Sequence, residues 1–218
     1  MTVAAIVQAR VRSTRLPGKV LLALPTGRTV LEEVLYRAGQ IDGVDVVVAA
    51  IPDTPECDLL LPYASSNHAV VVRGPEQDVL ARYRKAAEAV GADVILRITA
   101  DCPLLEPSVA AKVLTTRARY DAGYCSNSWP ARSFPHGWDC EAFTIGLLRR
   151  ADEAAHDPAD REHVCPWMQR QPSRALVKDM GDRASIRWTL DTIDDYIAIC
   201  GEFNRRLGHD AQGHPRAA

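Results

Sequence analysis

The sequence lacks the features that mark exported, membrane-spanning and general nucleic-acid-binding proteins. No apolar run approaches the about 18 residues of a membrane helix, so we expect no membrane partner. The chain opens on MTVAAIVQ, which has no basic stretch ahead of it and leads into an arginine-rich loop, unlike a signal peptide. We therefore expect a cytoplasmic protein. With 26 Lys and Arg against 28 Asp and Glu, it also lacks the cationic excess of a nucleic-acid binder.

Several signature motifs are absent as well. The six cysteines are scattered, without a C-x-x-C pair or a spacing that supports a zinc site, and we expect reduced, mostly structural thiols. The P-loop pattern G-x-x-x-x-G-K-[ST] and the dinucleotide fingerprint G-x-G-x-x-G do not occur. Phosphate binding, if present, must therefore use another kind of loop.

What is present is the composition of one globular domain. The 218 residues are 47% hydrophobic and 25% charged, without repeats or a long linker. A core of this size is self-sufficient, so we expect one domain over residues 1–208. Residues 209–218 read as a flexible tail.

Strand and helix patterns alternate in the first half of the chain. Short apolar runs at 2–8, 44–51, 69–72 and 93–99 read as buried strands, and helices are expected after 29, after 54 and over about 76–90. This alternation predicts an α/β fold of three layers, a mostly parallel mixed sheet with helices on both faces. Ligands bind beyond the carboxyl ends of the strands in such sheets, where the loops at 8–19, 73–78 and 99–104 converge.

The second half is less regular. Residues 126–138 are rich in turn formers and aromatic residues, which is typical of a substrate-facing loop or a surface excursion. Helices are predicted over 144–155 and around 161–163, and strands over 174–179 and 184–190. A last helix begins after Thr192, which reads as its N-cap.

The densest chemical signal is the loop after the first strand. It carries four cations without an acidic neighbour, interspersed with small hydroxyl residues and glycine: Arg10, Arg12, Arg15 and Lys19. Such a loop suits a polyphosphate, because backbone N–H groups approach the oxygens while the cations neutralise charge. The alternative is a solvated basic loop, and the position at the ligand edge favours phosphate binding.

Two aspartates stand at the ends of strand-like runs. Asp101 follows the 93–99 run, and Asp191 follows the 184–190 run. Taken singly, each could be a turn former or a cap neighbour. Taken as a pair at the ligand edge, they favour a Mg²⁺ site, since Mg²⁺ commonly uses one or two carboxylates together with phosphates and water.

Ordered motifs across about positions 3–200 resemble the CMP-sugar synthetases, which include the 3-deoxy-manno-octulosonate and acylneuraminate cytidylyltransferases. The likeness is closest to their spore-coat polysaccharide biosynthesis relatives. The motifs are Ala9-Arg10-x-x-Ser13-Thr14-Arg15-Leu16-Pro17-Gly18-Lys19, Arg73-Gly74-x-x-x-Asp78-Val79-Leu80-x-Arg82-Tyr83, Arg97-x-Thr99-Ala100-Asp101-Cys102-Pro103-Leu104, Asn127, Gly137-x-Asp139-x-Glu141, Arg161-Glu162-His163-Val164 and Leu190-Asp191-Thr192-x-x-Asp195.

The resemblance implies a nucleotidyltransferase fold and a CTP site at the first loop. Arg10, Arg15 and Lys19 would hold the triphosphate, and Asp101 and Asp191 would bind magnesium. Arg73 and the Ala9 backbone would lie near the cytosine, with Thr99 and Ala100 beneath the ribose. Ser13 and Asp78 belong to the same expected nucleotide site. The resemblance also implies a small-molecule acceptor and a homodimer.

For the acceptor pocket, polar residues of the second half are candidates: Asn127, His136, Asp139, Glu141, Arg161, His163 and Arg187. A lone histidine in a helix is more often structural, and Arg187 reads equally as an exposed charge. Cys102 stands where the sugar-acid synthetases often have an acidic residue, which leaves a second metal-linked carboxylate without a counterpart. The expected acceptor is a sugar acid, a sugar phosphate, a cyclitol or a phosphonate.

Two other functions compete with cytidylyl transfer. A glycosyltransferase of the related nucleotide-sugar fold usually carries a D-x-D metal motif, where this chain has Asp101-Cys102-Pro103. An inactive nucleotide-binding protein is the third candidate. Retention of the loop cations together with both aspartates favours a working transferase.

Overall fold

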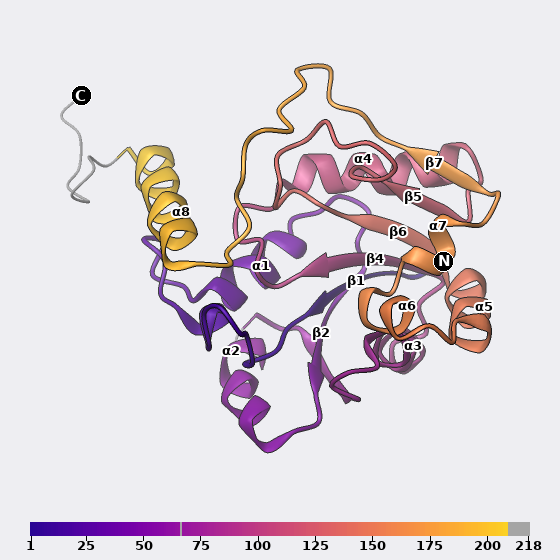
Figure 1. The fold of residues 1–218 in the computed structure, drawn as a ribbon, viewed down its shortest axis with the longest axis horizontal. Helices are drawn as coiled ribbons and strands as arrows, with labels where there is room; N and C mark the ends of the chain where they lie inside the picture. The colour runs from indigo at the N-terminus through magenta and orange to yellow at the C-terminus, as the bar shows by residue number, and fades with distance from the viewer. Residues whose placement is uncertain (66, 209–218) are drawn as a thin grey trace.

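A seven-stranded mixed sheet forms the centre of the protein (Figure 1). The computed structural model describes residues 1–65 and 67–208, so the tail expected at 209–218 lies outside the described residues. The strand order is β3-β2-β1-β4-β6-β5-β7, and β6 runs against the others. The strands are β1 (Val3–Gln8), β2 (Val46–Pro52), β3 (Val70–Gly74), β4 (Val94–Thr99), β5 (Tyr124–Ser126), β6 (Glu141–Thr144) and β7 (Arg174–Leu176).

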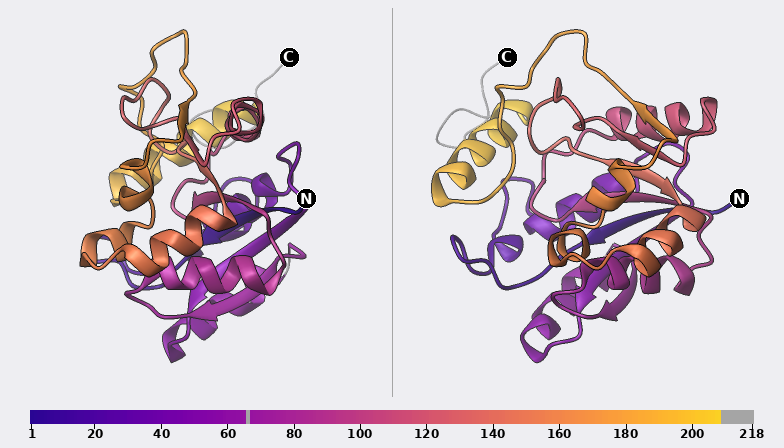
Figure 2. Two further views of the ribbon diagram at one scale, coloured as in Figure 1. Left: turned by 90° about the vertical axis from the view of Figure 1, so that its right-hand side faces the viewer. Right: turned by 45° about the vertical axis from the view of Figure 1, so that its right-hand side comes forward.

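Helices cover both faces of this sheet, which confirms the predicted three-layer fold (Figures 1 and 2). The longer ones are α1 (Val30–Ala38), α3 (Val79–Ala89), α4 (Pro107–Arg119), α5 (Ile145–Ala154) and α8 (Ile193–Arg206). The shorter ones are α2 (Leu61–Ser65), α6 (Pro158–His163), α7 (Pro166–Gln169) and the 3₁₀ turns η1 (Lys19–Leu21) and η2 (Pro55–Leu60).

Alternation along β1 explains the two apolar layers. Val3, Ala5 and Val7 point to the layer under α1, α2 and α4. Ala4 and Ile6 point to the opposite layer, under α3, α5 and α7. A strand whose successive side chains enter two cores must be apolar throughout, which is why this run shows no polar alternation.

Side-chain caps determine the residues at which several helices begin. They thereby determine where the loops of the ligand edge end. Thr29 and Glu32 form the predicted capping box of α1, and Thr192 with Asp195 forms the same motif at α8. Asp78 accepts a hydrogen bond from the Ala81 N–H, so α3 begins at Val79 rather than near 76. Residues 75–77 are left as a turn at the end of β3.

The predicted strand over 184–190 was wrong. Its backbone makes one isolated bridge, between His136 and Arg187, because the facing segment is the turn-rich 126–138 loop rather than a strand. The strand predicted over 174–179 is confirmed only for its first residues, where β7 pairs with the three-residue β5. No helix in the described part of the chain is long and apolar enough to cross a membrane.

Candidate active site

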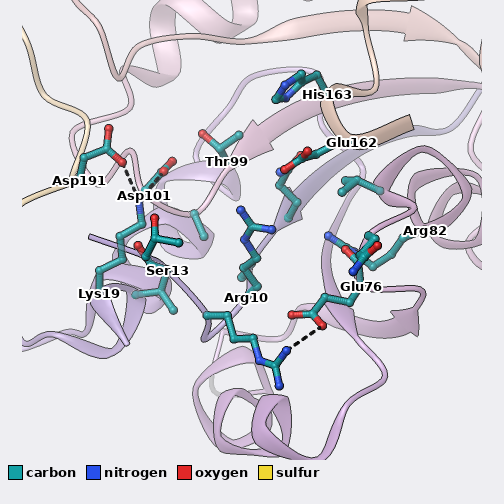
Figure 3. Close-up of a pocket in the computed structure, with 18 of the residues that line it drawn as sticks. Arg10, Ser13, Lys19, Glu76, Arg82, Thr99, Asp101, Glu162, His163 and Asp191 are labelled. Carbon is teal, nitrogen blue, oxygen red and sulfur yellow. Dashed lines mark hydrogen bonds and ion pairs between the residues drawn. The ribbon is translucent and has the colours of Figure 1, made fainter. Parts of the chain in front are cut away.

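A cavity of about 660 Å³ opens at the carboxyl ends of β1 and β4 (Figure 3). It lies between the loop after β1, the turn after β3, α6 and the segment that leads into α8. Of the residues predicted to bind nucleotide or metal, it gathers Ala9, Arg10, Ser13, Arg15, Lys19, Thr99, Ala100, Asp101 and Asp191. Segments far apart in the sequence thus meet where parallel sheets usually bind ligands.

Lys19 joins the two predicted metal ligands. Its ammonium lies 2.8 Å from the Asp101 carboxylate and 3.0 Å from the Asp191 carboxylate, and it donates to the Leu190 carbonyl at 2.6 Å. Burial alone would lower the pKa of Lys19, but both carboxylates favour the charged form and raise it overall. The lysine therefore stays protonated and offsets the repulsion between the two aspartates.

Asp191 has two further cationic neighbours. Arg15 lies 2.8 Å from one carboxylate oxygen, and Arg187 binds the other. Burial opposes ionisation of Asp191, but Lys19, Arg15 and Arg187 outweigh it and lower the pKa of this carboxyl. Although Arg187 was predicted for the acceptor pocket, in the structure it lies against Asp191 and Asp195.

Arg10 and Arg12 differ in how well they are neutralised. Arg12 lies 2.7 Å from Glu56 and 3.7 Å from Glu76, although its side chain is largely exposed. Arg10 is exposed at the centre of the cavity in Figure 3, and within residues 1–65 and 67–208 no hydrogen bond or ion pair reaches it. It is therefore a cation available for a bound anion.

Arg82 is a cavity residue for which the sequence analysis assigned no role. It is 1% exposed, and its guanidinium donates to the carbonyls of Pro75 and Glu76. Burial lowers the pKa of Arg82, and no carboxylate among the described residues lies close enough to form an ion pair with it. Gly74 makes room for it, because a Cβ there would lie 3.1 Å from the Arg82 Cγ. The arginine holds the turn after β3 against α3.

A buried ion pair lies under the same cavity. Arg97 of β4 lies directly opposite Glu141 of β6, and its Nη1 donates to the Glu141 carboxylate at 2.6 Å. Tyr124 and Gln169 also donate to this carboxylate. Burial would raise the pKa of Glu141, but the charge of Arg97 and the hydrogen bonds from Tyr124, Cys165 and Arg97 lower it overall. Arg97 lines the cavity, whereas Glu141 lies behind it.

The residues of the Arg161-Glu162-His163 motif on α6 point in different directions. Glu162 and His163 line the cavity, while Arg161 points to Asp78 and Asp152, at 2.6 Å from each. Arg161 also donates to the Asp152 carbonyl at 2.8 Å. The arginine therefore ties α6 to the start of α3 and to α5, and the predicted roles of Arg161 and Asp78 in ligand binding stay predictions.

The remaining predicted residues lie outside the cavity lining. Arg73 binds Asp58 and donates to the Thr54 carbonyl at 2.8 Å, which fixes the loop after β2. Asn127 is buried and bridges Trp138 and Cys140 through their backbone. Asp139 pairs with Arg132. His136 joins the bridge to Arg187, and burial lowers the pKa of its imidazole. The predicted role of Arg73 near the cytosine stays a prediction, as does the part of Asn127, His136 and Asp139 in acceptor binding.

Three charged cavity residues within the quoted motifs were left without a role by the sequence analysis: Arg82, Arg97 and Glu162. Each stands inside a motif quoted for the family resemblance, so position alone did not separate it from structural neighbours. Arg97 did carry a signal, because a charge inside the apolar run 94–98 is costly unless it is paired or functional.

Two carboxylates of the cavity, Asp101 and Asp191, are the candidate ligands for a divalent cation. No group of three or more His, Cys, Asp or Glu side chains with metal-ligand geometry occurs in the described part of the chain. Asp101 and Asp191 nevertheless fit Mg²⁺, which takes one or two carboxylates and completes its shell with phosphates and water. Cys102 is buried behind Asp101, with its thiol 3.2 Å from the Thr99 hydroxyl, and adds no carboxylate.

Gly137 determines how closely the 126–138 loop approaches the segment before Asp191. Its φ is +96°, and a Cβ there would lie 2.7 Å from the Trp188 carbonyl carbon. We expect Gly137→Ala to destabilise the fold by about 1–3 kcal/mol, through backbone strain and the clash. Thermal unfolding measures this loss.

Gly146 provides the matched control. It lies in α5, its φ is ordinary, and a Cβ added there would have no neighbour within 4 Å. Gly146→Ala should be neutral or stabilising by about 0.5–1 kcal/mol. Equal stability of Gly137→Ala and the wild type would contradict the close approach.

A mixed sheet between two layers of helices, with a cavity that combines a cationic loop and two aspartates at the ends of the strands, is typical of nucleotidyltransferases. The family model of the cytidylyltransferases matches residues 4–184. The chain therefore belongs to the cytidylyltransferase family, which confirms the resemblance stated from the motifs.

Individual proteins agree with this assignment. The spore coat polysaccharide biosynthesis protein SpsF of Bacillus subtilis is 32% identical over 204 residues, which are 89% of this chain and 83% of that protein. The 3-deoxy-manno-octulosonate cytidylyltransferase of Maricaulis maris is 34% identical over 121 residues, 53% of this chain and 44% of that protein. A solved cytidylyltransferase from Leptospira borgpetersenii superposes with a TM-score of 0.87 at 30% identity, covering 92% of this chain and 86% of that one.

Proposed function

We propose that the protein transfers CMP from CTP to a hydroxyl group of a small acceptor, in a Mg²⁺-dependent reaction that releases pyrophosphate. The observation that carries the proposal is the meeting of Lys19, Asp101 and Asp191 at the edge of the cavity. Family membership supports CTP as the donor. Similarity to SpsF supports a place in polysaccharide biosynthesis.

The reaction forms a bond between the acceptor oxygen and the α-phosphorus of CTP. The bond from the α-phosphorus to the oxygen that bridges the β-phosphorus breaks, its electron pair leaves with pyrophosphate, and the acceptor hydroxyl loses its proton. Mg²⁺ held by Asp101 and Asp191 would stabilise the negative charge that develops on the phosphate oxygens.

The side chains of the cavity divide this work. Arg10, exposed and without a protein partner in the described part of the chain, would bind the triphosphate. Lys19 keeps the two aspartates together and adds a fixed positive charge beside them. Thr99 and Ala100 also line the cavity, and the ribose is expected there. A cytoplasmic location and a homodimer stay predictions.

A thermal-shift screen tests the donor. CTP with Mg²⁺ should raise the unfolding temperature more than UTP, ATP or GTP, because a ligand that binds only the folded state stabilises it by mass action. Arg10→Gln should weaken CTP binding about 10- to 100-fold, since one charge-assisted hydrogen bond contributes about 1.5–3 kcal/mol.

The matched control is Arg205→Gln on α8, an exposed arginine that pairs only with Glu202 among the described residues. It should bind CTP like the wild type. Stabilisation by UTP rather than CTP would overturn the proposed donor. Pyrophosphate release with an acceptor panel then tests the transfer itself.

A further inference from the structure

All three N–H groups of the Lys19 ammonium are already in use. They donate to the Asp101 carboxylate at 2.8 Å, to the Asp191 carboxylate at 3.0 Å and to the Leu190 carbonyl at 2.6 Å (Figure 3). An ammonium has three donors and no more. Lys19 therefore cannot bind a triphosphate, its predicted role, unless it releases at least one of these oxygens.

The oxygens that Lys19 contacts are those that a divalent cation needs. Asp101 presents one oxygen to the lysine. Asp191 is contacted on both sides, because Arg15 shares its Oδ1 with the lysine and Arg187 binds its Oδ2. Three of the four carboxylate oxygens thus lie against a cationic side chain. A divalent cation that prefers carboxylate oxygens competes with these side chains for the same lone pairs.

The ion pairs around the two aspartates balance in charge. They join three cations to three carboxylates: Lys19, Arg15, Arg187, Asp101, Asp191 and Asp195. A divalent cation that entered by itself would add two positive charges to a neutral, partly buried cluster, where like charges repel more strongly than in water. A triphosphate supplies the compensating negative charge, together with oxygens that can accept from the lysine.

The cations of the loop after β1 are not equally available to such a ligand. Arg10 lines the cavity, and no hydrogen bond or ion pair reaches it in the described part of the chain. Lys19 and Arg15 line the same cavity but are bound to aspartates. An incoming triphosphate thus finds Arg10 free, whereas the other two cations become available only by leaving the carboxylates.

We propose that Lys19 is an internal counter-ion that couples metal binding to nucleotide binding. In the protein without nucleotide, its ammonium holds Asp101 and Asp191 against the entry of a divalent cation. The triphosphate takes over part of its N–H groups and frees carboxylate oxygens, while the Leu190 carbonyl keeps the ammonium beside the aspartates. Metal and CTP then bind with positive cooperativity, and each raises the affinity for the other by the same factor. This inference rests on the proposed function, since it concerns the two ligands of that reaction.

Mn²⁺ binding without nucleotide tests the competition directly. Mn²⁺ uses the same oxygen ligands as Mg²⁺, and the free ion is counted by its electron paramagnetic resonance signal. Lys19→Met keeps the apolar stem and removes the ammonium. This variant should bind Mn²⁺ about 10- to 100-fold more tightly than the wild type, which is the usual range of coupling between two sites. Arg15→Met, which releases one contact on Asp191, should show a smaller gain.

Two further variants assign the gain to this cluster. Arg12→Met removes one positive charge from the same loop, but Arg12 pairs with Glu56 and Glu76, so its affinity for Mn²⁺ should equal that of the wild type. Lys19→Met/Asp101→Asn should lose the gain, because one of the released carboxylates is gone. Arg15→Met keeps the test decisive if Lys19→Met does not fold, since the Arg15 side chain is 62% exposed.

The cooperativity itself is measured from the affinity for CTP, without acceptor, in EDTA and at saturating Mn²⁺. Association of Mn²⁺ with free CTP is the same in every sample, so a difference between two proteins comes from the protein. Mn²⁺ should raise the affinity for CTP more in the wild type than in Lys19→Met, because the variant has no ammonium to displace.

The outcomes separate the inference from the function on which it rests. A wild type that binds CTP neither in EDTA nor with Mn²⁺ would overturn the proposed function. If CTP binds but neither Lys19→Met nor Arg15→Met gains affinity for Mn²⁺, the lysine only positions the aspartates and the coupling is wrong. An equal gain in Arg12→Met, a gain that survives Asp101→Asn, or equal cooperativity in the wild type and Lys19→Met would also overturn it.

Discussion

Asp101→Asn is expected to slow pyrophosphate release from CTP about 1,000-fold. A bound metal ion stabilises the charge of the transition state by several kcal/mol, and loss of roughly 4 kcal/mol of this stabilisation corresponds to that factor. The amide keeps the size of the side chain but gives up the charge that pairs with Lys19 at 2.8 Å. A coupled pyrophosphate assay at saturating Mg²⁺ measures the rate.

Asp191→Asn should have a comparable effect, since the same ammonium joins both carboxylates. The control is Asp194→Asn, an exposed aspartate three positions further along, at the start of α8. It removes the same charge from the same segment and should retain wild-type activity. If Asp194→Asn lost as much activity as Asp191→Asn, the change in net charge alone would explain both losses. That result would contradict the role of Asp191 as a metal ligand.

The first half of the fold was predictable because its signals are local. Buried parallel strands are short apolar runs, and their helices begin at side-chain caps such as Thr29 with Glu32. The structure of the segment before Asp191 was not predictable. Its composition is typical of a strand, but the segment that faces it is not a regular strand with which it could pair. The close approach of Gly137 and the bridge from His136 to Arg187 hold it in place, and both depend on contacts between distant segments.

The site shows the same division. The loop carrying Arg10 and Lys19 was identified because its cations lack an acidic neighbour in the sequence and stand at the edge where parallel sheets bind ligands. Sequence could not separate Arg161 from its neighbour Glu162, because the direction of each side chain depends on which way α6 is turned. Two acidic residues from α3 and α5 set that direction by binding Arg161. The partner of Arg97 likewise became visible only when β6 lay opposite β4.

The Arg97–Glu141 pair also makes a prediction about folding. The single variant Arg97→Gln should lose about 3–5 kcal/mol of unfolding free energy near neutral pH, because it leaves the Glu141 carboxylate buried without its cation. The double variant Arg97→Gln/Glu141→Gln should recover most of this loss, since removing both charges also removes the cost of burying one. Urea unfolding of the three proteins measures the difference, and a double variant less stable than the single one would contradict it.

The Arg97–Glu141 pair also determines how folding stability changes with pH. The pKa of Glu141 is held below its ordinary value of 4.5 in the folded wild type, so the unfolded chain binds the proton more readily. The ion pair's contribution is therefore fully present above pH 4.5 and is lost as the pH falls through the lower, folded pKa. In Arg97→Gln the sign reverses, because burial without a cation raises the pKa of Glu141. Acidification should then narrow the stability gap between this variant and the wild type, whereas a gap that widens at low pH would place the charge of Glu141 outside the core.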